Sequence, residues 1–421
     1  MLRRDLRLTL GEKLDNLDTY VDISFFFMAF AVFTASGYEG QNYFYYAGFF
    51  LLFWMTVVKL AFRLRESSTV IFPYISFWTL AFLIICVISL FWAESKADAV
   101  RIISPLIQCT LITFMMSQHY ATRDGLDRCM KILSLAGSMH ILRILYATPF
   151  ENWFKGQLGR SIGQNPNTTA MICLLCGLIS FYYYDALRRK AYLIPALLQI
   201  SFVVLIGSRK SAIAGAIGIV LLAIMNLRRR HYLIRLLLAV ALVAAGLYII
   251  YKVPAMYKVL GRRFDTMLTF FQTGSGDKSI YFRQYFITLA RSLFYEHPLL
   301  GVGANNFCYH LGLIISRTGY AHNNYYEILA DLGFVGFVVY YGFYVYLGVN
   351  LLNIFRSKNN LALLMLVLLL VIMICEVGIV MYYRTYFYMF MALPAMFIAS
   401  HYGNPAENGY PYSAAQEAEA A

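Results

Sequence analysis

Residues 317–336 read RTGYAHNNYYEILADLGFVG and mark the point where a long polar segment meets a new apolar run. The polar segment extends from about Tyr251 to His322, and membrane-like sequence begins after Asn324. A histidine at the mouth of a membrane helix, beneath a basic loop, suggests chemistry at a lipid surface. The alternative is that the histidine and the asparagines only cap the helix.

The composition is that of a membrane protein. The 421 residues are 60% hydrophobic and only 14% charged, whereas a soluble domain is about half apolar and a quarter charged. The length accommodates about 12 spans of roughly 20 residues each. Backbone in contact with lipid must satisfy its own hydrogen bonds, which favours helices. We therefore predict an all-α polytopic membrane protein with about 12 transmembrane helices.

Apolar runs predict the spans and divide the chain. The runs cover about 22–37, 43–62, 71–93, 99–117, 129–148, 167–184, 191–207, 211–226, 232–251, 323–353, 360–377 and 381–400. Residues 1–251 thus hold nine spans, 252–321 form a large extracytoplasmic loop, and 322–400 hold three more spans. Residues 401–421 have no apolar periodicity, and we expect a disordered cytoplasmic tail there.

Lysine and arginine predict the orientation. They concentrate at the N-terminus and in every second loop, which places both termini in the cytoplasm. This distribution explains the net charge of +13 without nucleic acid as a partner. Long loops are translocated regardless of charge, so the basic loop 252–321 breaks no rule. Its positive charge has two possible explanations. The basic residues either form a solvent-exposed surface or bind an anionic substrate that approaches from outside.

Two short outer segments also carry positive charge. Arg160 lies between the fifth and sixth runs, and Arg209 and Lys210 follow Gly207 and Ser208 in a tight turn between two spans. Ser211 is expected to cap the second of these helices. A guanidinium beside a helix N-terminus suits a phosphate. The alternative is that Arg209 and Lys210 reach out to lipid headgroups.

The large loop contains one predicted amphipathic helix, from about Ser279 to Tyr295, with apolar residues at helical spacing. Arg283 lies in its first turns, and Arg291 follows on roughly the same face. Such a helix would lie on the membrane surface with its arginines directed inward or at headgroups. For Arg291, a purely interfacial role competes with a role in the site.

His322 is the candidate general base, because its pKa lies near neutrality in water. Asn323 either orients a sugar hydroxyl or caps the helix. Glu327 falls at the edge of the bilayer and needs a partner, which His322 or an arginine would supply. Glu376 lies in the last outer loop, and we expect it to pair with Arg384.

Several site types are absent from the sequence. It contains no HExxH, GxSxG or Walker motif. Cys173 and Cys176 form a CxxC inside an apolar run without a second ligand pair, so we expect no zinc site. We therefore predict no metal and no cofactor, and arginine in place of metal if a diphosphate is bound.

Three stretches together resemble the O-antigen ligase and polymerase superfamily of membrane glycosyltransferases. They are SRKSAIAG at 208–215, the arginine at 283 followed by ARSLFYEHPLLGVGANNF at 290–307, and AHNNYYEILADLGFVG at 321–336. The resemblance covers about residues 150–350, and the first five spans match only in hydropathy. Lys210 departs from the small residue that many members have at this position.

The resemblance implies a GT-C-like enzyme in the cytoplasmic (inner) membrane with its active site on the extracytoplasmic face. Its donor would be a glycan on undecaprenyl diphosphate, and its acceptor either another lipid-linked repeat or lipid A-core. By resemblance, Arg209 and Arg283 contact the diphosphate and His322 activates the acceptor hydroxyl. By resemblance, Glu376 matches the family's acidic residue in the last outer loop.

Two questions stay open at the level of sequence. Ligase and polymerase differ only in acceptor, and we lean towards the polymerase type. A transporter or flippase of lipid-linked sugars is the alternative class, to which His140, Arg143 and Arg101 give weak support. The late 70-residue loop and the lack of paired halves argue against it.

Overall fold

The computed structural model describes residues 2–35, 43–65, 74–156, 158–223, 232–274, 278–316 and 318–402. Helices dominate these ranges, and no strand occurs in them. The expected tail falls almost entirely outside them, because its residues 403–421 are not described. Arg317, at the start of the junction stretch, also lies outside.

Each of the twelve apolar runs coincides with a helix. The helices are α1 (Leu2–Ala35), α2 (Tyr43–Arg65), α3 (Tyr74–Ile88), α4 (Lys96–Tyr120), α5 (Arg123–Ala147), α6 (Pro166–Asp185), α7 (Leu193–Ile206), α8 (Arg209–Leu222), α9 (Tyr232–Lys252), α14 (Asn324–Phe355), α15 (Asn360–Glu376) and α16 (Thr385–Tyr402). Within the described residues, eight helices are long and apolar enough to cross a membrane, namely α1 to α6, α9 and α14. The protein is therefore a multi-pass helical membrane protein, and the number twelve stays a prediction.

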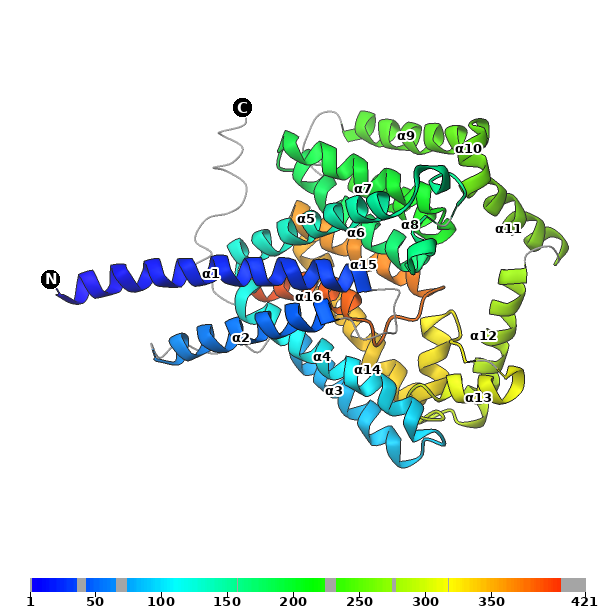
Figure 1. Ribbon diagram of the computed structural model, residues 1–421, viewed down its shortest axis with the longest axis horizontal. Coiled ribbons are helices and arrows are strands. Elements are labelled where there is room, and N and C mark those ends of the chain that lie inside the picture. Colours follow the sequence, from blue (N-terminus) through cyan, green and yellow to red (C-terminus); the bar gives the residue numbers. More distant parts are fainter. Residues whose placement is uncertain are drawn as a thin grey trace.

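The segment between α9 and α14 is helical as well. It contains α10 (Pro254–Met256), the π-helical turn η5 (Tyr257–Gly261), α11 (Arg262–Thr273), α12 (Lys278–Glu296) and α13 (Asn306–Ile315). In Figure 1 these elements follow the right edge of the molecule, from α9 at the top to α13 at the bottom. Helix α12 matches the amphipathic helix predicted for Ser279–Tyr295, and it packs against α14.

Burial differs sharply between the helices. Within its apolar window, α6 is 83% buried inside the protein, whereas α9 is only 11% buried. Asn165 caps α6 through its side-chain oxygen, and Pro166 occupies the first turn, where its missing N–H costs no hydrogen bond. Helix α6 thus forms part of the centre, and α9 presents most of its apolar surface outward, where lipid would cover it.

Helix α14 is broken near its first third. Gly333 has a φ of 63°, a value outside the helical range. Segment 298–303 inserts at this break and pairs with the interrupted backbone: Val302 N–H donates to Ala330 O, Gly303 N–H to Asp331 O, Phe334 N–H to Pro298 O and Val335 N–H to Leu299 O. Irregular backbone at membrane depth is tolerated where protein supplies its hydrogen bonds. The break ties the large segment between α9 and α14 to the helix that follows it.

Candidate functional site

The turn between α7 and α8 is fastened to the segment between α9 and α14 by two arginines. The Arg209 Nη1 donates to the backbone oxygen of Arg263 at 2.8 Å, and the Arg263 Nη1 donates to the backbone oxygen of Gly207 at 2.5 Å. Gly207 has a φ of 75°, and a Cβ there would lie 2.7 Å from the Val259 oxygen. Arg209 is buried as the first residue of α8, so this guanidinium is turned towards protein.

The cap of α8 differs from the expectation. Ser208, not Ser211, occupies the N-cap position. The Ser208 hydroxyl donates to Asn167 Oδ1 and to Ser211 Oγ, each at 3.2 Å. The prediction that Ser211 caps α8 is therefore wrong, because the chain enters the helix three residues earlier.

Lys210 is the most unusual cation of the site. Its Nζ is buried and has no hydrogen-bond partner among the described residues. The ammonium lies against Gly378, where a Cβ would come within 0.8 Å of it. The positive charges of Arg283 and Arg209 repel this ammonium. A buried ammonium without a partner is costly, and this cost would be relieved by an anion.

His322 lies beside this cluster of cations, in the short segment between α13 and α14. Its ring is 4.1 Å from the Tyr320 ring, centre to centre, and nearly parallel to the Phe286 ring of α12 at 6.1 Å. Burial, and then the positive charges of Arg283 and Lys210, lower the pKa of His322 to about 3. Its imidazole is therefore neutral at physiological pH, but in the site without substrate it is a weak base, because the best general bases have a pKa near the working pH.

The backbone of His322 is strained. Its φ is 56°, in the left-handed region, and such a conformation costs a non-glycine residue about 1–3 kcal/mol. Two neighbours hold it there. Asn323 is the N-cap of α14, with Oδ1 accepting from the N–H groups of Tyr325 and Tyr326. Glu327 Oε2 accepts from the N–H of Ala321 at 2.5 Å.

These contacts show what Asn323 and Glu327 bind within the protein. The amide oxygen of Asn323 caps α14, which is one of the two roles that the sequence suggested. The contact of Glu327 is the backbone of Ala321, although the charge of Arg384 also acts on its carboxylate. Both residues thus shape the segment that carries His322.

Glu376 has other partners than expected. It ends α15, fully buried, and its Oε1 accepts from Asn324 Nδ2 at 2.9 Å. The hydroxyls of Tyr340 and Tyr344 donate to the same oxygen at 3.0 Å and 2.8 Å. Arg384 stacks over the Tyr383 ring at 4.6 Å. The sequence-based pairing of Glu376 with Arg384 is thus replaced by a cage of hydroxyl and amide donors.

Asp331 was missed at the level of sequence. It is fully buried in α14, where Oδ1 accepts from the Phe307 N–H at 2.7 Å and Oδ2 from the Tyr382 hydroxyl at 2.8 Å. The sequence could have pointed to Asp331, because a second ionisable residue four positions after Glu327 in an apolar run is unusual. Arg160 begins the short helix η3 (Arg160–Ile162) with an exposed side chain, and the charges that act on His322 come from elsewhere.

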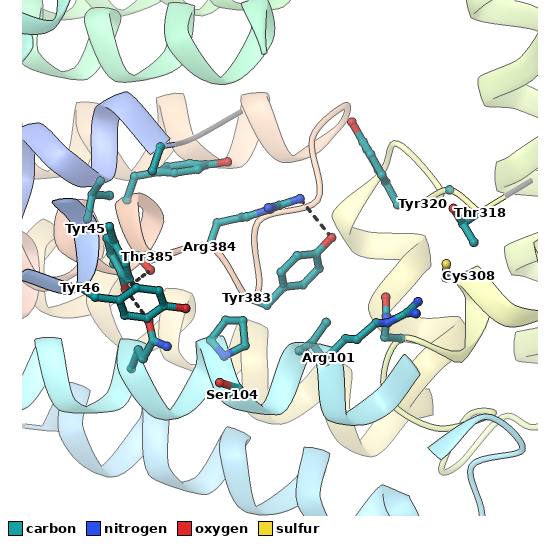
Figure 2. A pocket seen from close by; sticks show the side chains of 18 residues that line it. Tyr45, Tyr46, Arg101, Ser104, Cys308, Thr318, Tyr320, Tyr383, Arg384 and Thr385 are labelled. Carbon is teal, nitrogen blue, oxygen red and sulfur yellow. Dashed lines mark hydrogen bonds between the residues drawn. The ribbon is translucent and has the colours of Figure 1, made fainter. Parts of the chain in front are cut away.

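A cavity of about 820 Å³ is lined in part by Tyr320, whose ring also contacts the His322 ring, whereas His322 itself does not line it. Its walls come from α1, α2, α4, the segment 318–320 and the segment that leads into α16. Figure 2 shows Arg384 and Tyr383 extending into it, with Tyr45, Tyr46 and Arg101 around them. Arg209, Lys210 and Arg283 do not line it, so the cluster of cations and the cavity are two neighbouring features.

Comparison with known families matches residues 194–341 to the O-antigen ligase family. No curated protein matches the chain. The matched segment begins in α7, includes the whole segment between α9 and α14 and ends within α14. It contains Arg209, Lys210, Arg283 and His322, whereas Arg160 and Glu376 lie outside it. The match indicates a membrane enzyme of glycan assembly with a glycosyltransferase-like reaction. Residues 194–341, which carry these cations and the histidine, belong to the O-antigen ligase and polymerase superfamily.

Proposed function

We propose that the protein transfers a glycan from undecaprenyl diphosphate to a hydroxyl group of an acceptor sugar, at the extracytoplasmic face of the cytoplasmic membrane. The observation that carries the proposal is the buried ammonium of Lys210, which has no hydrogen-bond partner in the described structure and lies near Arg209 and Arg283. An anion would stabilise such a cluster, and a lipid-linked diphosphate has the charge and the membrane location that fit.

In the proposed reaction, the oxygen of the acceptor hydroxyl attacks the anomeric carbon of the donor. A new carbon–oxygen glycosidic bond forms while the bond between the anomeric carbon and the phosphate oxygen breaks. The electron pair leaves with the undecaprenyl diphosphate, whose developing charge the cations stabilise. The proton of the hydroxyl passes to His322, which is neutral and beside the cluster.

Each proposed role predicts how far the rate of transfer falls when the residue is replaced. Removing one group that stabilises developing charge typically lowers the rate about 10²–10³-fold. Removing a general base lowers it about 10²–10⁴-fold. Arg209 also fastens the α7–α8 turn to Arg263, so a substitution there would affect both charge and position. Asn323 and Glu327 are proposed to act indirectly, through the backbone of the His322 segment.

The test is glycan transfer by the purified protein in detergent, with an undecaprenyl diphosphate-linked oligosaccharide as donor. Lipid A-core and a second lipid-linked repeat would be offered separately, and the acceptor that reacts distinguishes a ligase from a polymerase. We lean towards the polymerase type. Arg209→Ala, Arg283→Ala and His322→Ala should each abolish detectable transfer at normal protein levels.

Matched controls come from the same segment between α9 and α14. Arg291 lies on α12 with Arg283 but is exposed, and His297 is an exposed histidine just after α12. Arg291→Ala and His297→Gln should retain transfer within about twofold, since exposed changes away from a site have small effects. Full activity of Arg283→Ala or His322→Ala would remove that residue from the mechanism.

Transport of a lipid-linked sugar is the second candidate, and one observation favours it. Helix α5 carries two buried ionisable residues, His140 and Arg143. Both ring nitrogens of His140 and the Nη1 of Arg143 have no hydrogen-bond partner in the described part of the chain. Unsatisfied ionisable groups within a membrane are typical of substrate paths. Movement of labelled lipid-linked glycan across proteoliposomes, without a new glycosidic bond, would support transport over transfer.

A further inference from the structure

We propose that the cavity lined in part by Tyr320 binds the acceptor, and that it selects an acceptor glycan bearing an acidic group, a phosphate or a carboxylate. The inference rests on the proposed glycan transfer and adds to it a second binding site. It starts from the position of the cavity and from the chemistry of its walls. None of Arg209, Lys210 and Arg283 lines this cavity.

The cavity has the size and the walls of a sugar site. Its volume of about 820 Å³ lies within the range of roughly 300–1,000 Å³ typical of small-molecule sites. This volume suits a few sugar rings. Aromatic rings and polar groups line it together, and the Tyr45 hydroxyl donates to Gln108 Oε1 at 2.6 Å within the wall. Such surfaces offer flat apolar contacts and hydrogen bonds, which sugar rings require together.

The position of the cavity fits the acceptor better than the donor. A general base must touch the hydroxyl that it deprotonates, so the acceptor has to reach His322. Tyr320 lines the cavity and also contacts the His322 ring at 4.1 Å between centres. The donor diphosphate is expected at Lys210 and Arg283, whose charges reach His322 from α8 and α12. His322 therefore lies between the two expected substrates.

The charge of the cavity suggests an acidic acceptor. Among the described residues that line it, two are cationic and none is a carboxylate. Arg101 is bound to Asp98 at 2.7 Å and is largely exposed. Arg384 extends over Tyr383 into the cavity, and its charge also acts on Glu327. A planar guanidinium at this place suits a phosphate or a carboxylate, with which it forms paired hydrogen bonds.

The experiment compares two acceptors that differ only in one acidic group. Initial rates would be measured for the full-length wild type, Arg384→Gln and Arg384→Lys, with donor and acceptor varied separately. We expect Arg384→Gln to raise the KM for the acidic acceptor about tenfold or more, as loss of one charge-assisted hydrogen bond predicts. The KM values for the neutral acceptor and for the donor should change less than about threefold. Arg384→Lys should recover part of the loss.

A second variant tests the cavity without touching Arg384. Ser104 lines the cavity on α4 and is exposed, so Ser104→Trp can fill the space with little effect on folding. Ile107→Trp is the matched control, since Ile107 is an exposed residue of the same helix. Ser104→Trp should abolish transfer to both acceptors, while undecaprenyl diphosphate still raises its melting temperature. Ile107→Trp should behave as the wild type.

Two results would overturn the inference. An equal fall of kcat with both acceptors in Arg384→Gln would show that Arg384 acts through Glu327 and not on the acceptor. A raised donor KM in Ser104→Trp, with an unchanged acceptor KM, would assign the cavity to the donor. If the wild type transfers no glycan at all, the proposed function fails instead. Calorimetric binding of the acidic oligosaccharide without donor would then still decide whether the cavity takes it.

Discussion

The carboxylate of Glu327 accepts a hydrogen bond from the backbone N–H of Ala321 at 2.5 Å. An acid buried in α14 thereby fixes the residue immediately before His322. Because His322 has a φ of 56°, its backbone would relax towards an unstrained conformation if this bond were lost. The position of the proposed base thus depends on a helix residue five positions later.

We predict that Glu327→Ala lowers kcat and destabilises the protein, whereas Glu327→Gln largely preserves both. An amide oxygen can still accept from Ala321, but a methyl group leaves a buried N–H without a partner, at a cost of about 1–3 kcal/mol. Transfer rates and melting temperatures in detergent would measure the difference. Equal loss in the two variants would mean that the charge of Glu327, and not its hydrogen bond, is what matters.

Gly333 should be intolerant of a side chain. Its φ is 63°, and a Cβ would lie 2.4 Å from the carbonyl carbon of Leu299. Gly333→Ala must therefore displace the inserted segment, and we expect a loss of more than about 2 kcal/mol. Gly342 in the same helix has open space around it, so Gly342→Ala should be neutral or gain up to about 1 kcal/mol. Similar melting temperatures for the two variants would contradict the close packing at the break.

The helices, and the prominence of four candidate site residues, follow from the sequence for physical reasons. Apolar runs of sufficient length must form helices in lipid, and each run coincides with one. Arg209, Lys210 and His322 stood out because charged or titratable residues at the edge of apolar sequence are conspicuous, and Arg283 stood out in the first turns of the predicted amphipathic helix. The structure brings their charges together, as a site of this kind requires.

What could not be predicted depends on packing between distant segments. The cage of Glu376 takes Tyr340 and Tyr344 from another helix, and tyrosines in an apolar run give no sign of their partner. Similarly, the cavity joins residues of α1, α2 and α4 to the segment before α16. The break at Gly333 was hidden for another reason, since a single glycine in an apolar helix is common in membranes.

Lys210 and Gly378 form a pair whose disruption should affect the donor. The Lys210 ammonium fills the space that a Cβ at Gly378 would need, so Gly378→Ala must push it aside. We expect Gly378→Ala and Lys210→Met to raise the donor KM by a similar factor, about tenfold, the size of one charge-assisted contact. Gly348→Ala is the control, since nothing lies near that position. An unchanged donor KM in both variants would separate Lys210 from the diphosphate.

The pH dependence of transfer should reveal how the donor affects His322. In the empty site, burial and the charges of Arg283 and Lys210 lower the pKa of His322 to about 3. A bound diphosphate would offset both cations, so the pKa of His322 should rise in the complex. A base works only in its neutral form, and activity is therefore lost as pH falls through its pKa.

For the same reason, kcat, which reports the complex, should fall at a higher pH than kcat/KM for the donor, which reports the free enzyme. From about pH 5 to 8, kcat/KM should show no acidic limb from His322. Arg283→Gln removes one repelling charge and should raise the pKa of His322 in the donor-free protein, measured by NMR titration of its imidazole, while Arg291→Gln, at an exposed position of the same helix, should leave this pKa unchanged. If the two variants had identical titration profiles, the charge of Arg283 would not control the proposed base.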